Sequence, residues 1–305
     1  MRDPGLPTLE QLRVFIAVID HGGFAHAARA LHRTQSVVSY TIANLEEQLN
    51  IELLDRSKRK PVLTEAGKAL LADARAVASK VDGMRSRAKA LGQGLEPEVS
   101  LVVDIMFPTC LLVRVLEAFQ TEFPTVSLRL HTEALGGVTL LVKEGRCQLG
   151  VAGLVTAGGP DLERHAAGHV KMMPVCSPRH PLAQIEGVLP TSLLREHLQL
   201  VVTDRSHLTE GQDFGVQALR DWRLGDLGSK HALLRGGVGW GNMPEAMVAD
   251  DLREGRLVRL QVQEGSELMY PMYVIHRGDN ELGPAGKWLR QQFITLDHSL
   301  PHRPF

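Results

Sequence analysis

The sequence predicts an α/β protein with an all-α head, a long linker helix and a two-lobed α/β body. Three observations predict this fold class: apolar residues at helical spacing through the first 50 positions, a 4-3 apolar repeat over 64–91, and strand-like segments alternating with helix-like ones beyond residue 97. A length of 305 residues allows about two domains. We therefore expect a head at residues 1–66, a linker and dimerisation helix at 64–91, and a body at 97–299.

Charge is distributed unevenly along the chain. Residues 1–91 contain 14 Lys and Arg against 10 Asp and Glu, whereas residues 92–305 contain 20 against 25. A mildly basic head thus precedes an acidic body, and the near-neutral total does not exclude a nucleic-acid partner. Three cysteines without a C-x-x-C pair favour a reducing compartment, and no run of about 18 apolar residues occurs. We therefore expect a cytoplasmic protein with no membrane partner.

Two helices are predicted before residue 34. Thr8 and Gln11 are spaced as a capping box at the start of the first, and the glycines at 22 and 23 end it. The second helix is short. Their apolar faces consist of Leu9, Leu12, Ile16 and Ile19 in the first helix and Phe24, Ala27, Ala28 and Leu31 in the second.

A third helix follows, with Thr34 as its N-cap and Asn50 as a left-handed C-terminal stop. One face is apolar and is expected in the core: Val38, Ile42, Leu45 and Leu49. The opposite face is small and polar: Ser36, Ser39, Tyr40, Ala43 and Asn44. Residues 24–49 therefore predict a helix-turn-helix whose last helix contacts base edges in the major groove. The alternative is a three-helix domain with a solvated polar face.

A basic segment comes next, with four cations before Pro61: Arg56, Lys58, Arg59 and Lys60. A run of this kind is usually a solvated surface. Between a helix-turn-helix and a coiled-coil repeat, it predicts a wing that binds phosphates, which supplies affinity rather than sequence preference.

The linker helix, about 40 Å long, carries a heptad seam: Leu70, Ala74, Val77, Val81, Met84, Ala88 and Leu91. An amphipathic helix packed on its own chain is the alternative. The strict spacing favours a dimer coiled coil, which presents two recognition helices to two symmetric half-sites.

The body alternates strands and helices in two sets, which indicates parallel sheets with crossover helices. The first set has strands at 99–104, 126–132 and 147–153 and helices at 109–122 and 138–144. The second begins near residue 170 and comprises segments 171–176, 198–203, 212–222, 233–239 and 244–253. A strand at 272–276 and a helix at 283–296 return to the first set. Two lobes joined by two crossing strands leave a cleft for a small ligand.

Polar and turn residues near strand ends form a candidate ligand site in that cleft, although each alone is more often a cap or turn residue. These residues are Asp104, Pro108, Thr109, Glu133, Thr203, Asp204, Ser206, Gly239 and Trp240, the last two within a glycine-rich strand-to-helix turn at 236–241. The carboxylates would repel a simple carboxylate ligand. We therefore predict a neutral hydroxylated, phenolic or cationic ligand.

Motifs of enzymes are missing from the sequence. The glycine run departs from G-x-G-x-x-G, and there is no P-loop, G-x-S-x-G or H-E-x-x-H. His165 and His169 are spaced i, i+4, without an evident third ligand. We predict no catalytic residue, no cofactor and no metal site.

The head resembles the N-terminal signature of LysR-type transcriptional regulators over residues 9–31, 34–46 (TQSVVSYTIANLE), 53–56 (LLDR) and 63–67 (LTEAG). Looser likeness extends through the body at 123–126 (FPTV), 180–182 (HPL) and 252–257 (LREGRL). The resemblance implies a winged helix-turn-helix, a dimerising linker and a periplasmic-binding-protein-like effector domain, with lobe I at 97–169 and 271–299 and lobe II at 170–270. It also implies dimers or tetramers on dyad sites of double-stranded promoter DNA, a small-molecule effector, and RNA polymerase as a further partner.

Carried over by position, the resemblance assigns DNA-facing roles to Gln35, Ser36, Ser39 and Tyr40, backbone contacts to Arg56, Lys58 and Arg59, and cleft positions to Thr109, Thr203 and the loop at Gly239. Many members have Arg at the position of Tyr40, a departure that bears on base preference. Peroxide-sensing members use a cysteine pair in lobe II, where this chain has only Cys176. The rival interpretation is a small-molecule-binding or enzymatic α/β protein whose helical head only mediates assembly.

Overall fold

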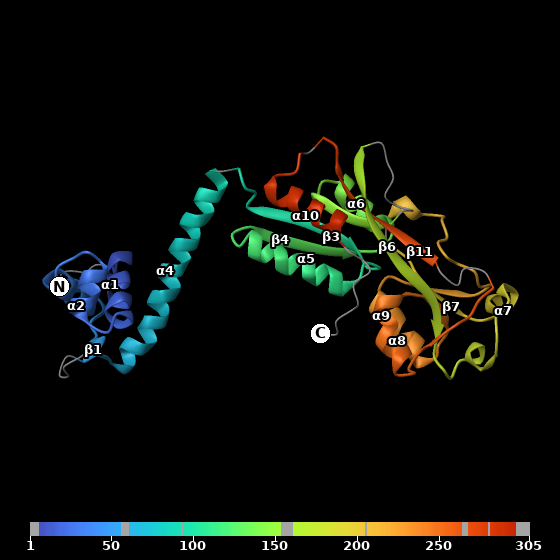
Figure 1. Ribbon diagram of the computed structural model, residues 1–305, viewed down its shortest axis with the longest axis horizontal. Helices are drawn as coiled ribbons and strands as arrows, with labels where there is room; N and C mark the ends of the chain where they lie inside the picture. The colour runs from blue at the N-terminus through green and yellow to red at the C-terminus, as the bar shows by residue number, and fades with distance from the viewer. Residues whose placement is uncertain are drawn as a thin grey trace. The chain divides into compact units, whose positions relative to one another are not determined.

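The computed structural model describes residues 6–55, 61–92, 94–153, 161–204, 206–263, 268–279 and 281–296. The chain divides into two compact units, Met1–Ala90 and Leu91–Phe305, whose elements are labelled in Figure 1. This division falls between the predicted linker helix at 64–91 and the predicted body at 97–299. Within the described residues, no helix combines the length and the apolar character needed to cross a membrane.

The head is built from α1 (Leu9–Asp20), α2 (Phe24–Ala30) and α3 (Gln35–Leu49). The predicted caps are present: Thr8 and Gln11 form a capping box, the Thr34 hydroxyl accepts from the Val37 N–H at 3.4 Å, and Asn50 has a φ of 52°. The three helices enclose one apolar cluster that includes Phe15, Val18, Ala27, Val38, Ile42 and Leu45. Burying each large side chain stabilises the fold by roughly 1.5–3 kcal/mol.

A two-stranded hairpin follows α3. Strands β1 (Leu54–Asp55) and β2 (Val62–Leu63) pair antiparallel, with Leu54 opposite Leu63. The Glu46 carboxylate on α3 accepts from the Leu53 and Leu54 N–H groups at 2.9 and 3.1 Å, which fixes the hairpin to the end of α3. The predicted wing cations lie between the two strands, outside the described residues: Arg56, Lys58, Arg59 and Lys60.

The linker is α4 (Glu65–Gly92), a helix of 28 residues. Its predicted seam is used in two ways. Leu70 and Ala74, together with Leu71, pack on the apolar cluster of the head. Farther along, Val77 and Met84 are exposed by 46 % and 62 %, and Ala88 and Leu91 are exposed as well. The first part of the seam therefore packs on its own chain, and for the exposed part the dimer coiled coil stays a prediction.

The body contains one mixed sheet, with strand order β4-β3-β5-β11-β6-β9-β7-β8 and β10 paired to β6. Lobe I comprises β3 (Glu98–Asp104), β4 (Ser127–Glu133), β5 (Leu149–Gly153), α5 (Thr109–Glu122), α6 (Gly136–Lys143) and α10 (Pro284–Thr295). Lobe II comprises η1 (Pro181–Gln184), α7 (Thr191–Glu196), β7 (Gln199–Val202), η2 (His207–Thr209), β8 (Asp221–Leu224), α8 (Leu227–Gly236), β9 (Trp240–Pro244), α9 (Glu245–Arg253) and β10 (Val258–Arg259). Strands β3, β4 and β5 are parallel, as are β7, β8 and β9, which confirms the parallel sheet predicted in each lobe.

Two predictions for lobe II were wrong. Residues 212–220 contain no helix or strand, and the regular structure of that segment starts only with β8. Residues 233–239 cover the end of α8 and the turn after it, so the glycine-rich segment 236–241 leads from a helix into strand β9 and not from a strand into a helix. Glycine marks a turn without indicating which kind of element precedes it.

Two long strands connect the lobes, as predicted. β6 (Leu162–Cys176) and β11 (Leu268–Arg277) run side by side and antiparallel (Figure 1). β11 pairs with β5 of lobe I through 272–275, and β6 pairs with β9 of lobe II through 172–176. Between these regions the register shifts between Pro271 and Tyr273, and Gly168 on β6 has a φ of 77°. A glycine in the left-handed region is what such a β-bulge requires.

Candidate DNA-binding face and ligand pocket

The outer face of α3 is polar, and its inner face packs into the core of the head. Val38, Ile42 and Leu45 are completely buried, so the positions opposite them on the helix face outward. Of the predicted contact residues, Gln35, Ser36 and Tyr40 are exposed, and Ser39 and Asn44 are half-buried beside them. The structure therefore brings the predicted residues of this helix together on one surface.

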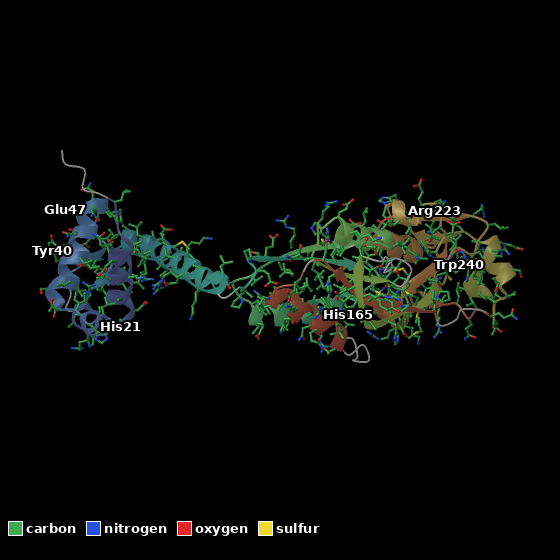
Figure 2. All side chains as sticks on the ribbon, turned by 90° about the horizontal axis from the view of Figure 1, so that it is seen from above. His21, Tyr40, Glu47, His165, Arg223 and Trp240 are labelled. Carbon is green, nitrogen blue, oxygen red and sulfur yellow. The ribbon has the colours of Figure 1, made fainter. Side chains whose placement is uncertain are left out.

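Tyr40 is the largest side chain on this surface. It is 68 % exposed, and Figure 2 shows it at the outside of the head. Its hydroxyl can donate and accept hydrogen bonds, and its ring can pack on a base or a sugar. The Thr34 and Ser36 hydroxyls lie 3.0 Å apart at the N-terminus of the helix, where the helix dipole favours a phosphate.

A pocket lies between the two lobes of the body. It consists of two hollows of about 510 and 380 Å³ that share Thr203, Asp204 and Ser206. The first extends into lobe II toward His207, Thr209, Glu210, Phe214 and Arg223. The second extends toward lobe I and is lined by Ile105, Thr132, Glu133, Gly137, Leu140 and Arg146. We call the two hollows together the interlobe pocket.

Asp204 organises the lobe II side of the interlobe pocket. Its carboxylate accepts hydrogen bonds from the Ser206 hydroxyl, at 2.5 Å, and from the Thr209 hydroxyl. Lobe I approaches this group closely at the first turn of α6. A Cβ on Gly136 would lie 2.2 Å from the Ser206 Oγ and 2.8 Å from the Asp204 Oδ2, so only glycine fits at this contact. Leu135, which lines the pocket just before it, has a φ of 45°.

Asp104 ends β3 next to Ile105, a pocket-lining residue. Only 1 % of Asp104 is exposed, and its carboxyl group accepts from the Met106 N–H at 2.9 Å and from the Tyr270 hydroxyl at 3.3 Å. Burial, with a smaller contribution from repulsion by Asp204, raises the pKa of this carboxyl group from 3.8 to about 7, against the lowering effect of these hydrogen bonds. Burial also raises the pKa of Tyr270, so the phenol stays protonated as the donor.

The described lining of the interlobe pocket contains more carboxylates than cations. The carboxylates are Glu133, Asp204, Glu210, Asp213 and Asp226, and the cations are Arg146 and Arg223. Arg223 pairs with Asp213 at 2.6 Å and with Asp221 at 3.0 Å. With Arg223 and Asp213 cancelling each other, four carboxylates remain against Arg146: Glu133, Asp204, Glu210 and Asp226. The pocket is therefore negatively charged at neutral pH.

The structure unites part of the site predicted from the sequence. Glu133, Thr203, Asp204 and Ser206 line the pocket, and Asp104 lies beside it. Pro108 is buried and Thr109 is exposed at the start of α5, and neither is among the described lining residues.

Gly239 and Trp240 also lie elsewhere, which corrects their assignment. A Cβ on Gly239 would meet the Leu198 carbonyl oxygen at 2.6 Å. Trp240 is 1 % exposed and packs with Leu182 and Leu189 in the core of lobe II, where its Nε1–H donates to the Leu194 carbonyl at 3.2 Å.

Sequence reasoning missed three residues of the site. Tyr270 has no local signature, because its partner Asp104 lies on a distant strand. Thr209 belongs to a short 3-10 helix that no periodicity indicates. Gly136 had a usable signal, since two consecutive glycines directly after the end of β4 suggest a close approach at the start of a helix.

Two family models match the chain. The one described as the LysR substrate binding domain matches residues 92–296, and the one described as a bacterial regulatory helix-turn-helix protein of the lysR family matches residues 9–68. The chain is 30 % identical over 295 residues to the HTH-type transcriptional regulator YeeY of Escherichia coli, covering 95 % of this chain and 94 % of that protein. It is 29 % identical to the HTH-type transcriptional activator AllS of Klebsiella pneumoniae, covering 82 % and 93 %.

Solved structures show the same fold. A full-length BenM variant superposes with a TM-score of 0.51 at 22 % identity, covering 94 % of this chain and 95 % of that one. DarR of Vibrio fischeri, solved in complex with DNA, superposes with a TM-score of 0.50 at 18 % identity, covering 96 % and 100 %.

Proposed function

The chain belongs to the LysR family of transcriptional regulators, with a DNA-binding helix-turn-helix and an effector-binding domain, and from this premise we propose how its residues divide the work. Tyr40, with Gln35, Ser36, Ser39 and Asn44 around it, contacts base edges in the major groove. The cations at 56–60 bind phosphates beside it and supply affinity for any sequence. The exposed polar face of α3, with Tyr40 at its centre, is the observation that carries this proposal.

The second element of the proposal is self-association through α4. Val77 and Met84 project from this helix without cover in the single chain, at the spacing of a coiled coil. A second copy would bury this stripe and present two recognition helices to a dyad promoter site. The resulting dimer or tetramer acts by binding DNA, effector and RNA polymerase, not by catalysis. It works in the cytoplasm, where promoter DNA lies.

The effector site in this proposal is the interlobe pocket. Its surplus of carboxylates disfavours organic acids and suits an uncharged hydroxylated or phenolic compound or an organic cation. Of these, the negative charge favours the cation most. Effector that binds more tightly to the closed lobes shifts the population toward that state, and the linked change in subunit geometry alters the spacing of the recognition helices.

A gel-shift experiment tests the core of this proposal. The purified full chain is titrated against the DNA upstream of its own coding region and against a scrambled duplex of equal length, each at two salt concentrations. We expect preferential binding of the upstream fragment and a loss of affinity for both duplexes at higher salt. Absence of binding to either duplex at low salt would favour a head that serves assembly alone.

A further inference from the structure

Three potential metal ligands meet on one face of the strand pair that joins the lobes. Glu163 and His165 lie two residues apart on β6, so their side chains leave the same face of the sheet. On β11, His276 is directly opposite Glu163 in the antiparallel register. The carboxylate and imidazole donor atoms of these residues all lie within 4.8 Å of one another.

This cluster replaces the His165 and His169 pair considered from the sequence. That pair assumed a helix, on which residues four apart share a face. Both histidines lie on strand β6, where residues four apart are separated by roughly 13 Å. His165 instead stacks on His276, with ring centroids 5.8 Å apart and planes inclined by 17° (His165 is labelled in Figure 2).

The orientation of the two rings indicates a missing partner. The buried Nε2 of His165 has no hydrogen-bond partner among the described residues, although leaving such an atom unsatisfied costs about 1–3 kcal/mol. His276 Nδ1 lies 3.2 Å from the Arg277 carbonyl oxygen, which can only accept, so Nδ1 carries the proton and Nε2 keeps a lone pair. Glu163 lies 3.4 Å from this Nε2, and Arg290 Nη1 lies 3.2 Å from it. A backbone carbonyl that accepts from the other ring nitrogen is the usual support of a metal-binding histidine.

We propose that Glu163, His165 and His276 bind a divalent transition-metal ion, with Zn²⁺ as the best match. Two imidazole nitrogens and one carboxylate oxygen are a ligand set of zinc sites that keep water in the fourth position. Glu163 also lines a surface hollow of about 460 Å³ together with Lys143, Asp161 and the Arg277–Asp279 ion pair, so its side chain is reached from solvent.

Arg290 on α10 competes for the same position. Its Nη1 lies 3.2 Å from the His276 Nε2, the lone pair that the ion would use. The ion must therefore displace the guanidinium, which is only half-buried and can turn toward solvent. Removing the Arg290 cation should strengthen metal binding. If the cluster only stabilises the fold, the same change should lower stability and leave metal binding absent.

The ion would bridge β6 and β11 three residues from Gly168. Because this strand pair connects the lobes, metal binding should stabilise the body against thermal unfolding, independently of whether the chain binds DNA.

The test uses the full chain, dialysed against a chelator and titrated with Zn²⁺ by calorimetry and with Co²⁺ by visible absorption. The wild-type protein should bind one ion per chain, show the absorption of a low-symmetry Co²⁺ site, and gain thermal stability. Glu163→Gln and His165→Gln should each weaken binding at least tenfold, and Arg290→Ala should strengthen it several-fold. His169→Gln, on the same strand, is the matched control and should bind as the wild type does.

The proposal is overturned if the wild type binds no stoichiometric ion, or if His165→Gln and His169→Gln bind equally well. Circular dichroism of each variant, recorded on the same sample as the Co²⁺ absorption, separates loss of a ligand from loss of the fold. Failure of this test leaves DNA binding untouched, since none of the four residues lies in the head.

Discussion

The Tyr270 hydroxyl donates a hydrogen bond to the buried carboxyl group of Asp104 at 3.3 Å, across 166 positions of sequence. This contact ties β11, which passes through both lobes, to the end of β3 beside the interlobe pocket. Because Asp104 is buried and close to Asp204, its charge state is sensitive to whatever occupies the pocket.

Stability should depend on pH through Asp104. Its pKa in the folded chain is about 7, against 3.8 unperturbed, so between these values the folded state binds more protons than the unfolded state. The free energy of unfolding should therefore fall as pH rises from about 4 to 7, by an amount on the order of 4 kcal/mol from this group, and then level off. Urea unfolding of the wild type and of Asp104→Asn across this range checks it: the variant should show the shallower dependence, and parallel curves would contradict the assignment.

Cationic ligands should bind more tightly at pH 8 than at pH 6. A cation near Asp104 and Asp204 favours the ionised carboxyl group, so its uptake releases a proton and is helped by alkaline conditions. A thermal-shift screen of organic cations, phenols, polyols and organic acids at both pH values measures this. We expect shifts from the first three classes, with a pH dependence confined to cations. If organic acids alone stabilise the chain, the proposed effector class is wrong.

Different residues should determine the affinity for any DNA duplex and the preference among DNA sequences. Arg56→Ala and Lys58→Ala should weaken binding to all duplexes alike and flatten the salt dependence by roughly one unit of slope each. Tyr40→Ala should change the ranking of duplexes by about 1–3 kcal/mol at the base pairs it contacts. Titrations of a small duplex panel at several salt concentrations distinguish the two effects, with Lys80→Ala, an exposed cation on α4, as the control. An equal loss on every duplex from all three substitutions would contradict this division.

Association should depend on the exposed stripe of α4. Met84→Glu places a charge in the predicted seam and should weaken the dimer at least about tenfold, or roughly 1.4 kcal/mol. Ser86→Glu adds the same charge on the exposed outer side of the helix and should leave the dimer intact. Sedimentation of both variants over a range of concentrations checks the difference, and equal behaviour would indicate that the chain associates elsewhere.

The contact between the lobes at Gly136 should tolerate no side chain. Gly136→Ala forces a methyl group against the Ser206 hydroxyl and the Asp204 carboxylate and should lower the free energy of unfolding by about 1–3 kcal/mol. Adding Ser206→Ala removes one of the two clashing atoms and should recover part of the loss. Gly236→Ala, whose Cβ would meet no atom closer than 4.0 Å, is the control. Independent, additive effects of the two substitutions would show that the lobes do not meet there.

The head was predictable because its determinants are local. The capping box of Thr8, the N-cap of Thr34 and the left-handed Asn50 each act within four residues, and apolar spacing assigned the faces of α3. The first half of β6 was missed for the opposite reason: Arg164 and His165 are polar, and the bulge at Gly168 interrupts the alternation by which a strand is recognised.

The candidate pocket was predictable only where topology dictates it. Asp204 and Ser206 follow a parallel strand at its carboxyl end, the edge at which ligand sites form. Trp240 was misplaced because the order of elements around the glycine run was inverted, so its side chain was assigned to a turn when it begins a buried strand. Tyr270 and Gly136 matter through contacts with distant segments. No short-range pattern indicates the contact of Tyr270, and the glycine pair at 136–137 indicates a close approach without identifying the segment that makes it.

The bulge in β6 and β11 is the position at which this strand pair can twist most easily and so let one lobe rotate against the other. At this position Pro271 supplies no N–H to the ladder, and Gly168 adopts a backbone geometry that other residues avoid. Twisting of the strand pair at the bulge disturbs fewer backbone hydrogen bonds than twisting at a regularly paired position. Each lobe can therefore retain its internal packing while it pivots. A β-branched residue at 168 would be strained at this φ and should destabilise the bulge, at a position outside the described lining of the interlobe pocket.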